Sequence, residues 1–134
     1  MIYMDVRVTY WIELSDYDLK TASVMLDGKR FLYVGFMVHQ SIEKILKAYY
    51  VMKYNEIPPF SHRLSLLAKR VSVFESLSEE QKDFMDLIEP LNIEARYPSN
   101  KEQLMKSLTE ERCRDIVNKA EELHTWIKQK LLKS

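Results

Sequence analysis

Apolar side chains recur along most of the chain at alternating steps of three and four residues, which is the spacing of one face of an α-helix. The pattern is clearest in a seam of seven positions: Phe31, Gly35, Val38, Ile42, Ile45, Tyr49 and Met52. Such a seam predicts a long helix that packs against a neighbour at about 20°. Gly35 costs about 1 kcal/mol of helix propensity relative to alanine, so we expect another helix to approach closely there. Pro58 and Pro59 end this helical region.

The same spacing predicts a helix that precedes this one. It runs from about Thr9, a suitable N-cap, to Asp27, with Gly28 as its stop. Its steps of four and three define a stripe that we expect to face the core: Tyr10, Leu14, Tyr17, Thr21 and Val24.

Two shorter helices are predicted in the middle of the chain. Ser61 is expected to cap the first of them, whose inward residues are Leu64, Leu67, Ala68 and Val71. Ser78 and Gln81 form a capping-box pattern that opens the second. Its expected inward residues are Phe84, Leu87, Ile88 and Leu91. Pro90 should kink this helix or end it early, and residues 95–100 are expected to form a loop.

The last predicted helix begins after Thr109 and has one apolar stripe, made of Cys113, Ile116, Ala120, Leu123 and Ile127. His124, beside that stripe, is expected at the surface or partly buried. Short connections make successive helices antiparallel. The sequence therefore predicts an all-α protein, an up-and-down bundle of four to five helices that forms a single domain over residues 1–134.

Composition narrows the function classes. Gly28 and Gly35 are the only glycines, which excludes the glycine motifs of phosphate loops, dinucleotide sites and nucleophile elbows. Cys113 is the only cysteine, which excludes an intrachain disulfide and a cysteine-based metal site and suits a reducing cytoplasm. No apolar run approaches the roughly 20 residues of a membrane span, and no secretion signal is visible. We expect a cytoplasmic protein without membrane contact, metal or cofactor.

Charge is balanced overall but unevenly distributed. The chain has 20 basic and 20 acidic residues. Residues 39–70 carry six basic and two acidic residues, a net +4, whereas residues 71–100 carry two and seven, a net −5. Either these are solvated helix faces that happen to differ, or a basic surface for phosphate lies beside an acidic surface for a partner.

The stretch HQSIEKILKAYY, residues 39–50, holds the candidate chemistry. His39, Glu43 and Lys47 are spaced four apart and share one side of the helix, with Gln40 and Lys44 close by. Glu43 and Lys47 could simply form an i,i+4 surface pair worth about 0.2–0.5 kcal/mol. Alternatively, an imidazole, a carboxylate and an ammonium on one strip could bind a phosphate or position a proton transfer. The spacing alone does not decide between them.

Several motifs, in this order, resemble the HEPN domain, a family of small helical bundles. The first is an Asp-Leu pair at residues 18–19, followed after a short loop by the helix pattern Gln40, Glu43, Lys44, Lys47 and Ala48. The second is SHRLSLL at residues 61–67, and the third is ARYP at residues 95–98. The resemblance covers roughly residues 9 to 130.

The resemblance implies a bundle of about five helices that forms homodimers. Stand-alone prokaryotic members are commonly encoded beside a minimal nucleotidyltransferase, and the pair acts as a toxin–antitoxin or related two-component system. Other members bind nucleotides, and many are metal-independent ribonucleases.

The ribonuclease branch uses an arginine and a histidine separated by four to six residues near the last helix, and this sequence departs from that pattern. Arg112 and Arg114 precede His124 with eleven and nine residues between. At 1.5 Å per residue these pairs lie roughly 15–18 Å apart along the axis, against about 7–10 Å for the family spacing. The usual nuclease pair is therefore not expected here.

The leading hypothesis is a HEPN-type nucleotide- or RNA-binding subunit that forms a homodimer and engages a minimal nucleotidyltransferase. Its expected ligand-binding residues come from the second helix, the start of the third and the ARYP loop: His39, Gln40, Glu43, Lys44, Lys47, His62, Arg96 and Tyr97. One alternative is a divergent metal-independent ribonuclease toxin with His62 and Arg96 as catalytic residues. Another is a structural dimer with no ligand, in which Arg96 pairs with Glu43 and His62 helps to cap its helix.

Overall fold

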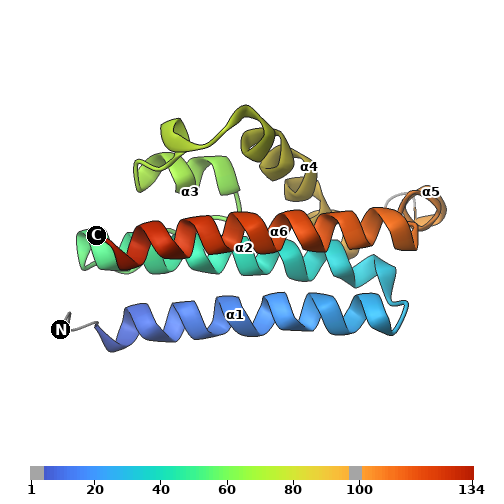
Figure 1. The fold of residues 1–134 in the computed structure, drawn as a ribbon, viewed down its shortest axis with the longest axis horizontal. Coiled ribbons are helices and arrows are strands. Elements are labelled where there is room, and N and C mark those ends of the chain that lie inside the picture. The colour runs from blue at the N-terminus through green and yellow to red at the C-terminus, as the bar shows by residue number, and fades with distance from the viewer. Residues whose placement is uncertain (1–4, 97–100) are drawn as a thin grey trace.

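The computed structural model describes residues 5–96 and 101–134, and within them the chain forms six α-helices and one short 3-10 turn. They are α1 (Val6–Asp27), α2 (Phe31–Tyr54), α3 (Leu64–Arg70), η1 (Phe74–Ser76), α4 (Glu79–Arg96), α5 (Lys101–Ser107) and α6 (Glu110–Leu132). Figure 1 shows α1, α2 and α6 as three long helices side by side, with α3 and α4 on the opposite side of α2 from α1. The predicted all-α bundle is confirmed.

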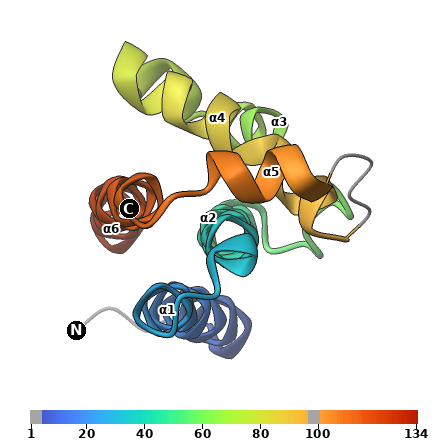
Figure 2. The ribbon, with the colours of Figure 1, turned by 90° about the vertical axis from the view of Figure 1, so that its right-hand side faces the viewer.

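Helix α2 is the centre of the bundle and contacts α1, α3, α4 and α6 (Figure 2). The predicted seam lies inside, and its members from Gly35 to Tyr49 are buried. A Cβ added to Gly35 would lie 2.5 Å from Leu91 Cδ1 and 3.1 Å from Leu91 Cβ. The close approach that the sequence predicted at Gly35 is therefore confirmed, and the helix that makes it is α4.

Helix α1 begins earlier than predicted and turns a different face to the core. Asp5, not Thr9, is its N-cap, because its carboxylate accepts a hydrogen bond from the Arg7 backbone N–H at 2.7 Å. Gly28 ends the helix as expected. The predicted inward stripe was wrong, since Tyr10, Tyr17 and Val24 are exposed. The buried residues are Val8, Ile12, Ser15, Asp18, Ala22 and Leu26.

Small side chains explain this choice of face. Ser15 Oγ donates to the Ser41 carbonyl at 2.6 Å, and Ser41 Oγ donates to the Ser15 carbonyl at 2.9 Å. This reciprocal pair, with Ala22 nearby on the same face, lets α1 lie close against α2. Two stripes of α1 have helical spacing, and the periodicity of the sequence alone could not tell which of them is covered.

Helix α3 is capped by a residue from another helix. Leu64, Leu67, Ala68 and Val71 are buried, as predicted. Ser61 is not the N-cap; its hydroxyl accepts from the Arg63 N–H at 3.1 Å, one turn too early. The first N–H of the helix, on Leu64, is bound instead by Glu89 Oε1 of α4 at 2.7 Å.

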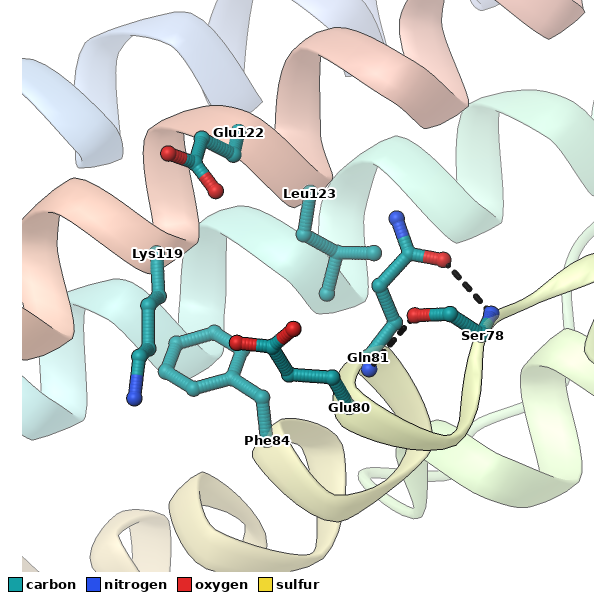
Figure 3. A pocket seen from close by; sticks show the side chains of 7 residues that line it. All are labelled: Ser78, Glu80, Gln81, Phe84, Lys119, Glu122 and Leu123. Atoms are coloured by element: carbon teal, nitrogen blue, oxygen red, sulfur yellow. Dashed lines mark hydrogen bonds between the residues drawn. The ribbon is translucent and has the colours of Figure 1, made fainter.

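Helix α4 opens with the predicted capping box. Gln81 N–H donates to Ser78 Oγ at 3.0 Å, and Ser78 N–H donates to Gln81 Oε1 at 2.8 Å (Figure 3). The helix continues through Pro90 to Arg96, so the expected early end and the loop from residue 95 were wrong. Leu87, predicted inward, is 40% exposed, because the helix turns Met85 and Asn92 inward instead.

The last part of the chain agrees with the sequence except for one short helix. Thr109 Oγ1 caps α6 by accepting from the Arg112 N–H at 3.2 Å, and every residue of the predicted stripe is buried. Helix α5 was not predicted. Helix α6 runs in the same direction as α2 and opposite to α1 (Figure 1). Among the described residues, no helix combines the length and apolar character of a membrane span.

Candidate functional site where α2 meets the start of α3

A buried carboxylate lies at the centre of the polar strip on α2. Glu43 is only 4% exposed, and both of its oxygens are paired. Oε1 accepts a hydrogen bond from His62 Nδ1 at 2.7 Å, and Oε2 accepts one from Lys47 Nζ at 3.1 Å. A buried charge requires such partners. Glu43 therefore joins its own helix to the segment that leads into α3.

His39, one turn before Glu43, holds the same segment through its backbone. Its Nε2 lies 2.9 Å from the His62 carbonyl oxygen, which can only accept, so Nε2 carries the proton. Its Nδ1 lies 3.8 Å from Glu43 Oε1 and has no hydrogen-bond partner among the described residues. Burial lowers the pKa of His39, and nearby Glu43 only partly opposes that effect. The ring is therefore held in its neutral form.

His62 is the member of this group that meets solvent. Its side chain is 53% exposed, whereas that of Glu43 is 5% exposed. Because Nδ1 donates to Glu43, Nε2 is the nitrogen that can exchange a proton with a bound molecule. A carboxylate that fixes one ring nitrogen of an accessible imidazole is an arrangement suited to general acid–base chemistry.

Lys47 balances the charge of Glu43 from inside the protein. The lysine is 7% exposed, and its ammonium lies 5.8 Å from the centroid of the Trp11 ring of α1. That distance allows a cation–π interaction. Lys47 thus neutralises Glu43 while it ties α2 to α1, and it is too deeply buried to be a free surface cation.

The remaining predicted ligand-binding residues point elsewhere or lie outside the described side chains. Gln40 Nε2 donates to Asn92 Oδ1 of α4 at 2.9 Å. Lys44 forms an ion pair with the largely buried Asp18 of α1. The side chain of Arg96 and all of Tyr97 lie outside what the structure describes. The structure therefore brings together His39, Glu43, Lys47 and His62, while Gln40 and Lys44 contact two other helices.

A second histidine–carboxylate pair, which sequence reasoning missed, joins α1 to α6. His124 Nε2 lies 3.1 Å from Asp16 Oδ1, although the two are not aligned for a hydrogen bond. Lys128 Nζ donates to both Asp16 oxygens, at 3.2 and 2.9 Å. His124 is buried, not at the surface or partly buried as expected, and burial lowers its pKa despite the opposing effect of Asp16. Its place beside Leu123 was the only available signal.

The arginines expected at a nuclease centre do not approach this histidine's surroundings. Arg114 forms an ion pair with Glu110 at 3.3 Å, and Arg112 donates to the Ser107 carbonyl at 3.4 Å. Both arginines line an open depression at the start of α6, whereas His124 faces α1 further along the helix.

A separate cavity of about 170 Å³ lies between α4 and α6, and Figure 3 shows its lining. The Phe84 ring and Leu123 form its apolar part, with Glu80, Glu122 and Lys119 at its edge. None of the predicted ligand-binding residues lines it. In the described part of the chain, no cluster of three or more His, Cys, Asp or Glu could hold a metal ion.

Comparison with known families decides the relationship. The family model described as the HEPN domain matches residues 8–131. The chain belongs to the HEPN domain family. A similar solved HEPN-like fold is the crystal structure of TT1696 from Thermus thermophilus, with a TM-score of 0.80 and 17% sequence identity. The alignment covers 92% of this chain and 98% of that one. No curated protein sequence matches the chain.

Membership of the HEPN family accounts for the order of the three motifs and for the bundle. Sequence identity of 17% shows a shared fold only. The roles of His62 and its neighbours in this HEPN domain must therefore be argued from their own geometry.

Proposed function

We propose that this HEPN domain is the nucleotide- or RNA-binding subunit of a cytoplasmic two-component system of the toxin–antitoxin type. It acts as a homodimer, and its protein partner is a minimal nucleotidyltransferase. The observation that carries the proposal is the half-exposed His62 imidazole, held by the buried Glu43–Lys47 pair. It is a fixed polar group at the mouth of an otherwise satisfied network.

Charge and chemistry support a phosphate-bearing ligand. Residues 39–70 carry a net charge of +4, and the His62 segment lies within them. Arg96 and Tyr97 follow α4 directly in the sequence and are part of the proposal. Arginine makes bidentate contacts with phosphate, and tyrosine stacks on a base. The ligand would lie against His62, with His39, Glu43 and Lys47 behind it as support.

The binding test uses the purified chain with ATP, with single-stranded RNA and with the product of the neighbouring gene. We expect saturable binding of at least one of them. Arg96→Ala and His62→Ala should weaken nucleotide or RNA binding, whereas Lys119→Ala, an exposed cation on α6, should not. Absence of binding to all three probes would contradict the proposal and leave the structural dimer, in which Lys47→Ala and Arg96→Ala change stability only.

A divergent metal-independent ribonuclease is the second candidate, and one observation favours it. His62 Nδ1 is fixed by Glu43 at 2.7 Å, which prepares Nε2 for proton transfer to or from a ribose 2′-oxygen. Arg96 would stabilise the phosphate. Incubation with tRNA in EDTA separates the two candidates. Cleavage that disappears in His62→Ala favours the ribonuclease, and intact tRNA with retained binding favours the binding subunit.

A further inference from the structure

One side of α1 is an uncovered apolar stripe. The residues first expected to face the core, Tyr10, Tyr17 and Val24, are 58%, 71% and 55% exposed. Leu14 and Thr21 complete the stripe and are partly exposed. Figures 1 and 2 show α1 at the edge of the bundle, with the other helices on one side of it only. The stripe therefore runs along the free side of a 22-residue helix.

The spacing of this stripe fits another long helix. Its members follow each other at steps of four, three, four and three residues. That repeat keeps the apolar positions in a straight line only when two helices cross at about 20° and interdigitate. Isolated exposed apolar residues are ordinary, but a heptad repeat along an uncovered helix is a pattern of association.

We propose that the α1 helices of two copies of this chain pack antiparallel on each other through this stripe, about a two-fold axis between Ser15 and Asp16. In a two-fold contact the same patch is used by both copies. Tyr17 then lies against the partner's Leu14, and Tyr10 lies against the partner's Thr21. Residues 6–25 overlap, which is about 30 Å of helix.

Charges beside the stripe select this register. Glu13 and Lys20 are exposed and occupy equivalent flanking positions, seven residues apart. In the proposed register, Glu13 lies beside the partner's Lys20, and the symmetry repeats the pair. A shift by one heptad places either Lys20 beside the partner's Lys20 or Glu13 beside the partner's Glu13. A parallel pair places Glu13 beside the partner's Asp18. Opposite charges at flanking positions set partner and orientation in paired helices.

A cavity at one end of the stripe extends the contact. It measures about 460 Å³ and lies between the start of α1 and the end of α2, with an almost entirely apolar lining that includes Val6, Tyr10, Val51 and Ile57. The proposed register places the partner's Val24 opposite Arg7, at the edge of this cavity. Ile57, 77% exposed, adds apolar area beside it.

Charge reversal tests the register, with the dissociation constant of the dimer measured by sedimentation. Glu13→Lys and Lys20→Glu should each weaken the dimer about tenfold, because each replaces two attractive pairs with two repulsive ones. The double variant Glu13→Lys/Lys20→Glu should restore it. Tyr17→Glu, at the centre, should dissociate it, whereas Tyr33→Glu, an exposed tyrosine on α2, should not. Circular dichroism checks that each variant is folded.

This inference rests on the homodimer of the proposed function, and the outcomes separate the two. A monomeric wild-type chain overturns both the homodimer and the surface. A dimer that is indifferent to both single reversals, or not restored by the double one, overturns the α1 surface alone. Loss of ATP and RNA binding by a chain that still dimerises and responds to the reversals contradicts the proposed ligand and leaves the surface supported.

Discussion

Two histidine–carboxylate pairs tie the helices of this bundle, and they differ in which partner is buried. At the start of α3 the carboxylate is inside and the imidazole outside: Glu43 is 5% and His62 53% exposed. Between α1 and α6 the order is reversed: His124 is 6% and Asp16 42% exposed. Each carboxylate also binds one lysine, Lys47 or Lys128.

The reversal separates a site from a strut. A buried imidazole that is kept neutral can fill space and hold helices, but it cannot meet a ligand. An exposed imidazole whose one nitrogen is fixed from behind can meet a ligand and keep its orientation. The same two residue types therefore serve different purposes, and burial decides which.

The largest expected difference is in stability. Glu43→Ala leaves Lys47 buried without a counter-charge, which costs about 3–5 kcal/mol of unfolding free energy. Asp16→Ala removes a half-exposed carboxylate and should cost about 1 kcal/mol or less. Denaturant unfolding of both variants measures the difference. The double variant Glu43→Gln/Lys47→Met should recover much of the loss, and equal costs for Glu43→Ala and Asp16→Ala would contradict the contrast.

The next effect is a pH dependence from the two buried histidines. Burial lowers the pKa of both His39 and His124 from the usual 6.5, so the folded protein takes up these protons less readily than the unfolded chain. Their stabilising effect is present above pH 6.5 and is lost as the pH falls below it. The slope approaches about 1.4 kcal/mol per pH unit for each histidine.

Thermal or denaturant unfolding between pH 7.5 and 5 measures this slope. His124→Gln and His39→Gln should each make it shallower. A slope unchanged in both variants would mean that neither buried ring resists protonation.

The smallest perturbation is chemical labelling at neutral pH. Diethyl pyrocarbonate acylates accessible imidazoles, and this chain has only three histidines. His62 should react first, because His39 and His124 are 0% and 5% exposed. Mass spectrometry of the labelled peptides reads the three rates separately. Labelling of His124 as fast as His62 would remove the difference on which the comparison depends.

Local signals in the sequence predicted much of the fold. The α2 seam, the capping box of α4 and the stripe of α6 each depend on residues within a few turns of one another, and all three are confirmed. The α1 face and the α3 cap were wrong because their causes are distant. Ser41 decides which side of α1 is covered, and Glu89 supplies the cap that was assigned to Ser61.

The candidate site was predictable only in part, for the same reason. The family motifs placed His62 and Glu43 in one hypothesis, and the structure brings them into contact. The helical spacing also grouped Gln40 and Lys44 with them, but neighbouring positions on a central helix face different partners. The pair of His124 and Asp16 left no pattern, because residues on separate helices carry no common spacing.

The most direct test of the account follows the three histidine rings by NMR while ATP, and separately a short single-stranded RNA, is added to the wild-type protein. The account predicts that the ring resonances of His62 move in a saturable way with at least one probe, while those of His124 stay in place. Resonances of His62 that stay fixed with both probes, or a shift confined to His124, would contradict it.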